Sequence, residues 1–268
     1  MKQHGRLYLK KKINKKIEAN FEKLYQLVKI LRSEDGCDWD KVQTSDSLIP
    51  YFIEEVYELI DSIDKKDHKN TKEELGDIIL HLVFQAQILD ESGPYTINDI
   101  LESINTKIVD RHPHVFHKKS QISNTKTDWE LQKHIEKKRT SRLDGVPNIL
   151  PSIIFSQRIQ EKASLAGFDW DDINDVWLKI DEEIKELKIA QNRNDLDNIH
   201  EEIGDILFSL INLSRHLGVS AENALRKSNK KFIRRFQLLE NEISGLNKTI
   251  DECSAEDLNE LWEKIKYN

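Results

Sequence analysis

The sequence contains the same acidic pattern twice, and this duplication constrains the fold more than any other feature of the chain. Residues 54–58 read Glu-Glu-Val-Tyr-Glu and residues 74–77 read Glu-Leu-Gly-Asp, while residues 182–186 read Glu-Glu-Ile-Lys-Glu and residues 202–205 read Glu-Ile-Gly-Asp. Both elements recur at a constant offset of 128 positions, from 54 to 182 and from 74 to 202. Two acidic sets at one fixed spacing predict two related modules, each with a site of the kind that binds magnesium.

Composition favours a helix-rich protein that works in a reducing compartment. The chain has 268 residues, of which 33% are charged and 7% aromatic, with only 9 Gly and 5 Pro, a balance untypical of β-sandwiches and of disordered chains. The net charge of −7 argues against stable nucleic-acid binding. Cys37 and Cys253 are too few for a disulfide framework. No signal peptide or membrane-length apolar run is recognised, so we expect a cytoplasmic protein with no membrane partner.

Helix punctuation is frequent and strand alternation is weak, which predicts an all-α fold. Thr96-Ile-Asn-Asp99 and Ser254-Ala-Glu-Asp257 resemble capping boxes with Asp in place of Glu. Three glycines after periodic segments predict helix ends, namely Gly93, Gly167 and Gly218. The expected helices cover residues 18–32, 46–65, 70–91, 97–111, 126–140, 149–165, 172–191, 195–217, 220–243 and 255–266.

The duplication also predicts how the chain is divided. We expect a basic N-terminal extension, two helical-bundle modules and a linker between them. Isolated four-helix modules of this size would leave apolar helix faces exposed, so we expect a homodimer. The four segments are residues 1–17 (extension), 18–120 (first module), 121–147 (linker) and 148–268 (second module).

The acidic residues lie on helices whose other positions are mostly apolar. At 100° per residue, Glu202 and Asp205 share one strip, and Glu74 and Asp77 repeat it in the first copy. A helix that is apolar nearly all round is expected to be buried, so its acidic strip must face something polar. Gly76 and Gly204 in the same helices predict either close helix approach beside the acids or ordinary helix packing.

If the two acidic elements of each copy face each other, their carboxylates would form a cation site. If the elements lie apart, the acids would form an ordinary solvated helix face. Two charges about 5 Å apart repel by roughly 3 kcal/mol at an effective dielectric constant near 20, which favours a bound cation. Ligands that are all oxygen favour Mg²⁺, with Mn²⁺ as the alternative, over zinc. A di-iron bundle would need Glu-x-x-His, and neither 74–77 nor 202–205 supplies that His.

The chain resembles the all-α nucleoside triphosphate pyrophosphohydrolases, and over residues 18–268 the two-module MazG type. The resemblance rests on the duplicated acidic signature and on several further stretches. It implies Mg²⁺-dependent hydrolysis of a nucleoside triphosphate (NTP or dNTP) to a monophosphate and pyrophosphate, for nucleotide-pool cleansing or regulation. The stretches are Gly36-Cys-Asp-Trp-Asp40, Gln43-Thr44, Arg111-His-Pro-His-Val-Phe116, Gly167-Phe-Asp-Trp170, Asn212-Leu-Ser-Arg-His-Leu-Gly218 and residues 224–236.

The resemblance also assigns roles to residues of this chain. The implied metal ligands are Glu183, Glu186, Glu202 and Asp205, with Glu55, Glu58, Glu74 and Asp77 as their first-module counterparts. It implies that the second module is the catalytic one, although both quartets are intact. One carboxylate of the set Glu182, Glu183 and Glu186 would orient and deprotonate the attacking water, unless a second metal ion activates it.

Acids that bind a triphosphate also need positive charge nearby. Lys231 and Arg235 share one helix face, Trp262 and Lys266 form another i, i+4 pair, and Lys179 lies one turn before Glu183. The expected substrate-binding residues are Lys179, Lys231, Arg235, Trp262, Lys266, Lys133 and Trp170, of which Lys133 rests on the resemblance alone. Trp170 is expected either to stack on a base or to pack in the core.

Two rival interpretations remain at this stage. One is an enzyme restricted to damaged or non-standard dNTPs. The other is a non-enzymatic interaction protein whose acidic sites are vestigial. A regulatory protein partner is known for some members of the family, but no residue of this chain indicates one.

Overall fold

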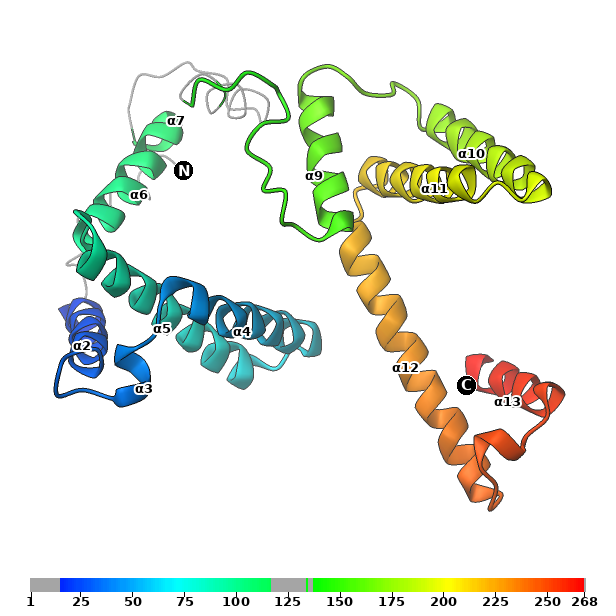
Figure 1. The fold of residues 1–268 in the computed structure, drawn as a ribbon, viewed down its shortest axis with the longest axis horizontal. Coiled ribbons are helices and arrows are strands. Elements are labelled where there is room, and N and C mark those ends of the chain that lie inside the picture. Colours follow the sequence, from blue (N-terminus) through cyan, green and yellow to red (C-terminus); the bar gives the residue numbers. More distant parts are fainter. Residues whose placement is uncertain (1–14, 117–133, 135–136, 268) are drawn as a thin grey trace. The chain divides into compact units, whose positions relative to one another are not determined.

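The computed structural model describes residues 15–116, 134 and 137–267. The chain divides into two compact units, Met1–Ser123 and Asn124–Asn268, and each is described by itself (Figure 1). Every regular element in the described residues is a helix, which confirms the predicted all-α fold. None of the helices in this described part is long and apolar enough to cross a membrane.

The first unit is built around a hairpin of two long helices. The helices α4 and α5 form this hairpin, and α2 packs against α5. A small apolar core contains Val28 of α2, Leu48 of α4, and Val83 and Phe84 of α5. The elements are α2 (Lys15–Leu31), α3 (Asp38–Lys41), α4 (Ser45–Lys65), α5 (His68–Ser92), α6 (Ile97–Arg111) and α7 (Pro113–Phe116).

The second unit repeats the hairpin and adds helices on either side. The helices α10 and α11 form the hairpin, and α9 packs against α11. The helix α13 packs against part of the length of α12 (Figure 1). A small core of Val176, Ile180 and Leu213 holds the hairpin together. The elements are α9 (Ser152–Leu165), α10 (Ile173–Arg193), α11 (Leu196–His216), α12 (Ala221–Gly245), the 3₁₀ helix η1 (Ile250–Glu252) and α13 (Ala255–Tyr267).

The two hairpins turn in the same way. Lys66 after α4 and Asn194 after α10 both adopt the left-handed conformation, with φ of 56° and 53°. The next residue in each case, Asp67 or Asp195, accepts hydrogen bonds from backbone N–H groups at the start of the following helix. Because these turns also lie 128 positions apart, the local signals that set the hairpin geometry are duplicated together with the acids.

Several predicted helix ends are confirmed. Thr96 and Asp99 form a capping box, and Ser254 and Asp257 exchange equivalent hydrogen bonds at the start of α13. The helix predicted at 126–140 lies largely outside the described residues. Its last part is wrong, because residues 137 and 138 form a turn, residues 139 and 140 are not helical, and Lys138 has a positive φ of 48°, which a helix does not tolerate.

The prediction that the acidic helices are buried on all other sides is wrong within one chain. Leu75 and Leu82 on α5 are 47% and 55% exposed, and Leu207 on α11 is 56% exposed. Close helix approach at the two helical glycines is also wrong, since a Cβ at Gly76 or Gly204 would meet no described atom within 4 Å. The hairpins therefore expose a broad apolar face beside their acids.

Candidate metal and nucleotide site

The hairpin of the second unit brings three carboxylates together. Glu183 and Glu186 lie one turn apart on α10, and Glu202 lies on α11 opposite them. Each offers an oxygen atom, and these oxygens all lie within 4.8 Å of one another. Three oxygen donors at this separation can hold a hard divalent cation.

The electrostatics of this cluster favour a bound cation. Burial and the neighbouring charges of Glu186 and Glu183 raise the pKa of Glu202 above its usual range. Glu183 is buried, and Glu202 Oε2 is enclosed and has no hydrogen-bond partner. An enclosed carboxylate oxygen without a donor is unfavourable, so the residues present fit a divalent metal ion.

Asp205 lies next to this group without belonging to it. Its charge contributes to the raised pKa of Glu202, but its oxygens are not among those that lie within 4.8 Å of one another. Of the four expected ligands, the structure thus gathers Glu183, Glu186 and Glu202 tightly, with Asp205 near them.

Lys179 binds the acids of its own helix. Its Nζ lies 2.9 Å from Glu182 Oε1 and 2.7 Å from Glu183 Oε1. The hydrogen bonds that Lys179 donates to Glu183 and Glu182 raise the pKa of Lys179, which therefore stays protonated. Glu182 is drawn to this lysine and stands outside the three-carboxylate group.

The first unit repeats the carboxylates but not the lysine. Glu55, Glu58 and Glu74 form a group of the same kind, and burial followed by the charges of Asp77 and Glu58 raises the pKa of Glu55. The position 128 residues before Lys179 holds Tyr51. No positive charge therefore stands where Lys179 stands in the second unit.

Tyr51 packs edge-on against Trp39, with ring centroids 5.9 Å apart. Trp39 belongs to the Gly36-Cys-Asp-Trp-Asp stretch, the first-unit version of the loop that precedes α10. An aromatic pair thus occupies the place where the second unit has an ion pair.

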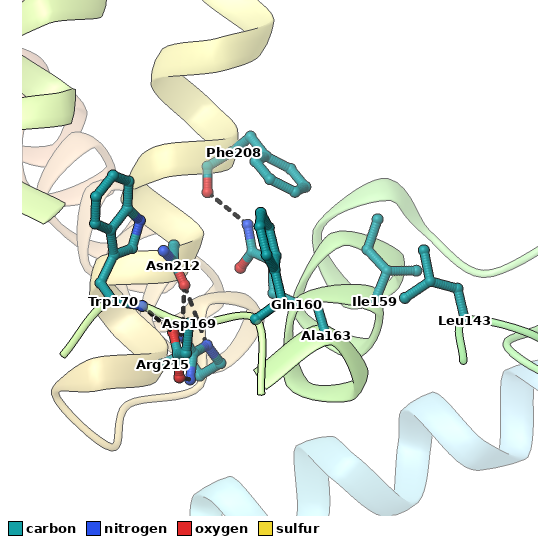
Figure 2. A pocket seen from close by; sticks show the side chains of 10 residues that line it. Leu143, Ile159, Gln160, Ala163, Asp169, Trp170, Phe208, Asn212 and Arg215 are labelled. Atoms are coloured by element: carbon teal, nitrogen blue, oxygen red, sulfur yellow. Dashed lines mark hydrogen bonds and ion pairs between the residues drawn. The ribbon is translucent and has the colours of Figure 1, made fainter. Parts of the chain in front are cut away.

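A cavity of about 430 Å³ lies between α9, α11 and the loop before α10 in the second unit (Figure 2). Its walls are mainly apolar, and its polar side chains come from α9, α11 and the loop before α10. Trp170 lines it and is 47% exposed, so it is not a core residue. The lining residues are Leu143, Ile159, Gln160, Ala163, Phe168, Asp169, Trp170, Phe208, Asn212 and Arg215.

An ion pair fixes the loop that carries Trp170. Both terminal nitrogens of Arg215 hydrogen-bond the carboxylate of Asp169, and Arg215 Nη2 also donates to Asn212 Oδ1 at 2.8 Å. Burial would raise the pKa of Asp169, but hydrogen bonds from Arg215 and Ser164 outweigh it and lower the pKa to about 2. Arg215 is therefore committed to holding the loop.

The remaining predicted substrate-binding residues gather on α12 and α13, apart from the acids. Arg235 Nη2 donates to the Lys266 carbonyl at 3.3 Å, and Trp262 packs on Phe232 with ring centroids 5.4 Å apart. Among the described residues, no ion pair joins Lys231 or Arg235 to the acidic cluster. Lys133 lies outside the described residues.

No pattern in the sequence predicts a role for Gln160, Phe208 or Arg215. Helical periodicity does place Asn212 near the Glu202–Asp205 strip, because seven residues complete almost two turns. Gln160 lies on another helix, and no spacing in the sequence relates it to the acids. Only the packing of α9 on α11 brings it to the cavity.

Comparisons with known proteins find relatives over most of the chain. Residues 43–116 and 174–238 match the MazG nucleotide pyrophosphohydrolase domain, and these segments contain both acidic sets. A Thermotoga maritima protein named nucleoside triphosphate pyrophosphohydrolase/pyrophosphatase MazG is 46% identical, covering 92% of this chain and 95% of its own. The Escherichia coli K12 nucleoside triphosphate pyrophosphohydrolase is 37% identical, covering 91% and 96%. Bacillus subtilis YabN is 38% identical over 95% of this chain and 53% of its own.

Proposed function

The chain belongs to the MazG nucleotide pyrophosphohydrolase family, and we propose that its second unit hydrolyses nucleoside triphosphates to a nucleoside monophosphate and pyrophosphate. The observation that carries this proposal is the group of Glu183, Glu186 and Glu202, whose oxygens lie within 4.8 Å of one another. The enclosed and unpartnered Oε2 of Glu202 supports a cation there. The donor set favours Mg²⁺, with Mn²⁺ as a substitute.

The reaction needs an aligned water molecule and a means of dispersing negative charge. Glu183, Glu186 and Glu202, with Asp205 beside them, would hold a Mg²⁺ ion, and the ion would neutralise charge on the phosphate oxygens. A water oxygen forms a bond to the α-phosphorus, the bond from that phosphorus to the α–β bridging oxygen breaks, and pyrophosphate leaves. A carboxylate of the set Glu182, Glu183 and Glu186 accepts the proton of the water.

Lys179 supports this chemistry by balancing charge. It holds Glu182 and Glu183 at 2.9 and 2.7 Å, so the acids keep their positions before substrate arrives. Its positive charge also reduces repulsion between the acidic cluster and an incoming triphosphate. Tyr51 has no such charge, and we therefore assign catalysis to the second unit and a scaffold role to the first.

We further propose a homodimer in which a second copy completes the site. Leu75, Leu82 and Leu207 are about half exposed on the hairpins, and exposed apolar faces of this kind mark protein–protein contacts. Lys231 and Arg235 make no ion pair with the acids among the described residues. We therefore propose that these two positive charges come from α12 of the partner. Trp262 and Lys266 of the α13 helix would come from the partner with them.

The proposed domain limits follow the sequence analysis: 1–17, 18–120, 121–147 and 148–268. The division of the chain between Ser123 and Asn124 falls in the proposed linker, which supports these limits. Cys37 and Cys253 are both free thiols. Free thiols and a nucleotide substrate suit the cytoplasm.

The test is product analysis with each of the eight common NTPs and dNTPs in the presence of Mg²⁺ and, separately, Mn²⁺. A Glu202→Gln, Asp205→Asn double variant is compared with the matched Glu74→Gln, Asp77→Asn variant of the first unit. We expect monophosphate and pyrophosphate from the wild type, loss only in the first variant, and near wild-type activity in the second. Absence of both products with every nucleotide, or equal loss in the two variants, would contradict the proposal.

A further inference from the structure

Gln160 presents a buried hydrogen-bond acceptor that has nothing to accept. The side chain lies on α9 and is only 7% exposed. Its Nε2 donates to the Phe208 carbonyl of α11 at 2.8 Å, which fixes the orientation of the carboxamide because the reverse orientation would set two acceptors against each other. Its Oε1 is enclosed and has no hydrogen-bond partner. A buried acceptor without a donor is unfavourable, and native proteins rarely retain one.

The side chain that carries this acceptor lines the cavity between α9 and α11. Figure 2 shows the Gln160 nitrogen turned toward the Phe208 carbonyl and the oxygen turned away from it. The cavity is lined by Trp170 and Phe208 as well as by Gln160, so aromatic surface and an unused acceptor lie in the same space. Such a space fits a flat, aromatic ligand that carries an N–H group at its edge.

A second amide in the cavity has the opposite hydrogen-bonding capacity. Asn212 Oδ1 accepts from Arg215 Nε at 3.1 Å and from Arg215 Nη2 at 2.8 Å, so the oxygen is engaged and its orientation is set. Its Nδ2 has no partner among the described residues. Gln160 thus offers an acceptor and Asn212 a donor to a ligand in this cavity, and a base edge with an N–H group beside a ring nitrogen or a carbonyl carries the complementary pair.

The position of the cavity along α11 fits the distance between the phosphates and the base of a nucleotide. At 1.5 Å per residue, Phe208 and Asn212 lie about 5 and about 10 Å beyond Asp205 along the helix axis. Asp205 and Asn212 are almost two full turns apart, so both lie on the same side of the helix. A triphosphate held at the acids, with its base directed toward the C-terminal end of α11, would reach this cavity.

We propose that Gln160 accepts a hydrogen bond from an N–H group of the substrate's nucleobase, with Asn212 donating to the adjacent acceptor and Trp170 and Phe208 forming the walls. The substrate class of this subsite is an intact nucleotide with an unmodified base edge. This inference rests on the proposed function, because the acids set the direction from which the base enters. A donor beside an acceptor occurs on adenine, guanine, cytosine and uracil alike, so the subsite selects for a base without selecting strongly among bases.

The competing explanation is that Gln160 only ties α9 to α11 through the Phe208 carbonyl. The two roles use different atoms, because the tie uses Nε2 and the recognition uses Oε1. ATP can distinguish the two roles, because the 6-amino group is the only N–H donor on its base. Purine riboside triphosphate has hydrogen in place of that amino group and is otherwise identical.

The experiment measures KM and kcat for ATP and for purine riboside triphosphate with wild-type protein and the Gln160→Met variant. Calorimetric binding of the α,β-methylene analogues of both nucleotides accompanies the kinetics. We expect Gln160→Met to raise KM and Kd for ATP about tenfold, to leave the purine analogue unchanged and to alter kcat by less than about twofold. Gln157→Met is the matched control, because Gln157 lies on the same helix, bonds Glu161 and does not line this cavity.

Equal losses for the two nucleotides, or no loss for either, would overturn the inference. The wild-type protein gives a second measurement that does not depend on how a variant folds, because it should bind ATP about tenfold more tightly than purine riboside triphosphate; equal affinities would also overturn the inference. The calorimetry keeps this inference separate from the proposed function. If binding depends on the amino group but no pyrophosphate forms, the base subsite stands and the proposed enzymatic activity is wrong. If pyrophosphate forms but binding does not depend on the amino group, the activity stands and the base subsite is wrong.

Discussion

Lys179 Nζ lies 2.7 Å from Glu183 Oε1, one turn further along α10, and the Glu183 side chain is only 4% exposed. A carboxylate removed from water to this extent is tolerated because a permanent positive charge compensates it. The pairing has a consequence for metal binding. The lysine and a divalent cation compete for the same carboxylate.

Removal of this lysine should strengthen metal binding and weaken substrate binding. Lys179→Met takes away the charge that competes for Glu183, so Mg²⁺ affinity should rise by roughly threefold to tenfold, while KM for the triphosphate should rise by a similar factor. Calorimetric titration with MgCl₂ and steady-state kinetics measure the two effects. Lys185→Met removes the same charge from an exposed position on α10 and should change neither. A weaker affinity for Mg²⁺ in Lys179→Met would contradict the competition.

Neutralising one acid should stabilise the metal-free protein. Glu202→Gln removes a carboxylate whose pKa is raised by burial and by Glu186 and Glu183, so the melting temperature without metal should increase. The same change should lower Mg²⁺ affinity by about tenfold or more and cancel the rise in melting temperature that Mg²⁺ gives the wild type. Differential scanning fluorimetry with and without MgCl₂ measures both. Glu201→Gln, at the exposed neighbouring position, should behave like the wild type.

The ion pair between Asp169 and Arg215, which line the cavity, should make the free energy of unfolding depend on pH in the acid range. Asp169 has its pKa lowered to about 2 in the folded protein, against a value near 3.9 in an unfolded chain. Its contribution, about 2 kcal/mol, is therefore complete above pH 4 and is lost as the pH falls toward 2. Asp169→Asn should lower the free energy of unfolding at pH 6, and the gap to the wild type should narrow below pH 4.

Urea unfolding at a series of pH values measures this gap. Asp171→Asn, two residues away and exposed, is the control and should stay within about 0.5 kcal/mol of the wild type throughout. A gap between Asp169→Asn and the wild type that stayed constant from pH 6 to pH 3 would rule out this role for the Asp169–Arg215 pair.

Mixing two inactive variants should restore activity if the partner supplies the charges of α12. Glu202→Gln disables the acids of one copy, and Arg235→Ala removes a positive charge that the other copy needs. Each mixed dimer would contain one complete site, so equal amounts should regain about a quarter of wild-type activity after exchange of subunits. Pyrophosphate release before and after mixing is the measurement. No recovery, in a mixture shown to exchange subunits, would mean that Arg235 acts on the acids of its own chain.

Much of the fold and part of the site were predictable because the decisive signals are local. Helical periodicity, the caps at Thr96 and Ser254 and the two acidic sets depend on spacings within a few turns. The burial prediction failed for a related reason. Periodicity reports which face of α5 or α11 is apolar, but whether that face meets its own chain or a partner depends on contacts that spacing does not contain.

The sequence by itself determined that this chain is helical and that the acids of each element share one face of their own helix. The geometry of a helix makes residues three and four positions apart neighbours, whatever surrounds them. Only the tertiary structure decided that Lys179 neutralises Glu183, that Arg215 holds the Trp170 loop, and that Gln160 of α9 turns an unused acceptor into the cavity next to α11. The last two depend on contacts between elements distant in the chain, and the burial of Glu183 depends on packing. Such contacts follow from the fit of whole surfaces, which no local spacing encodes.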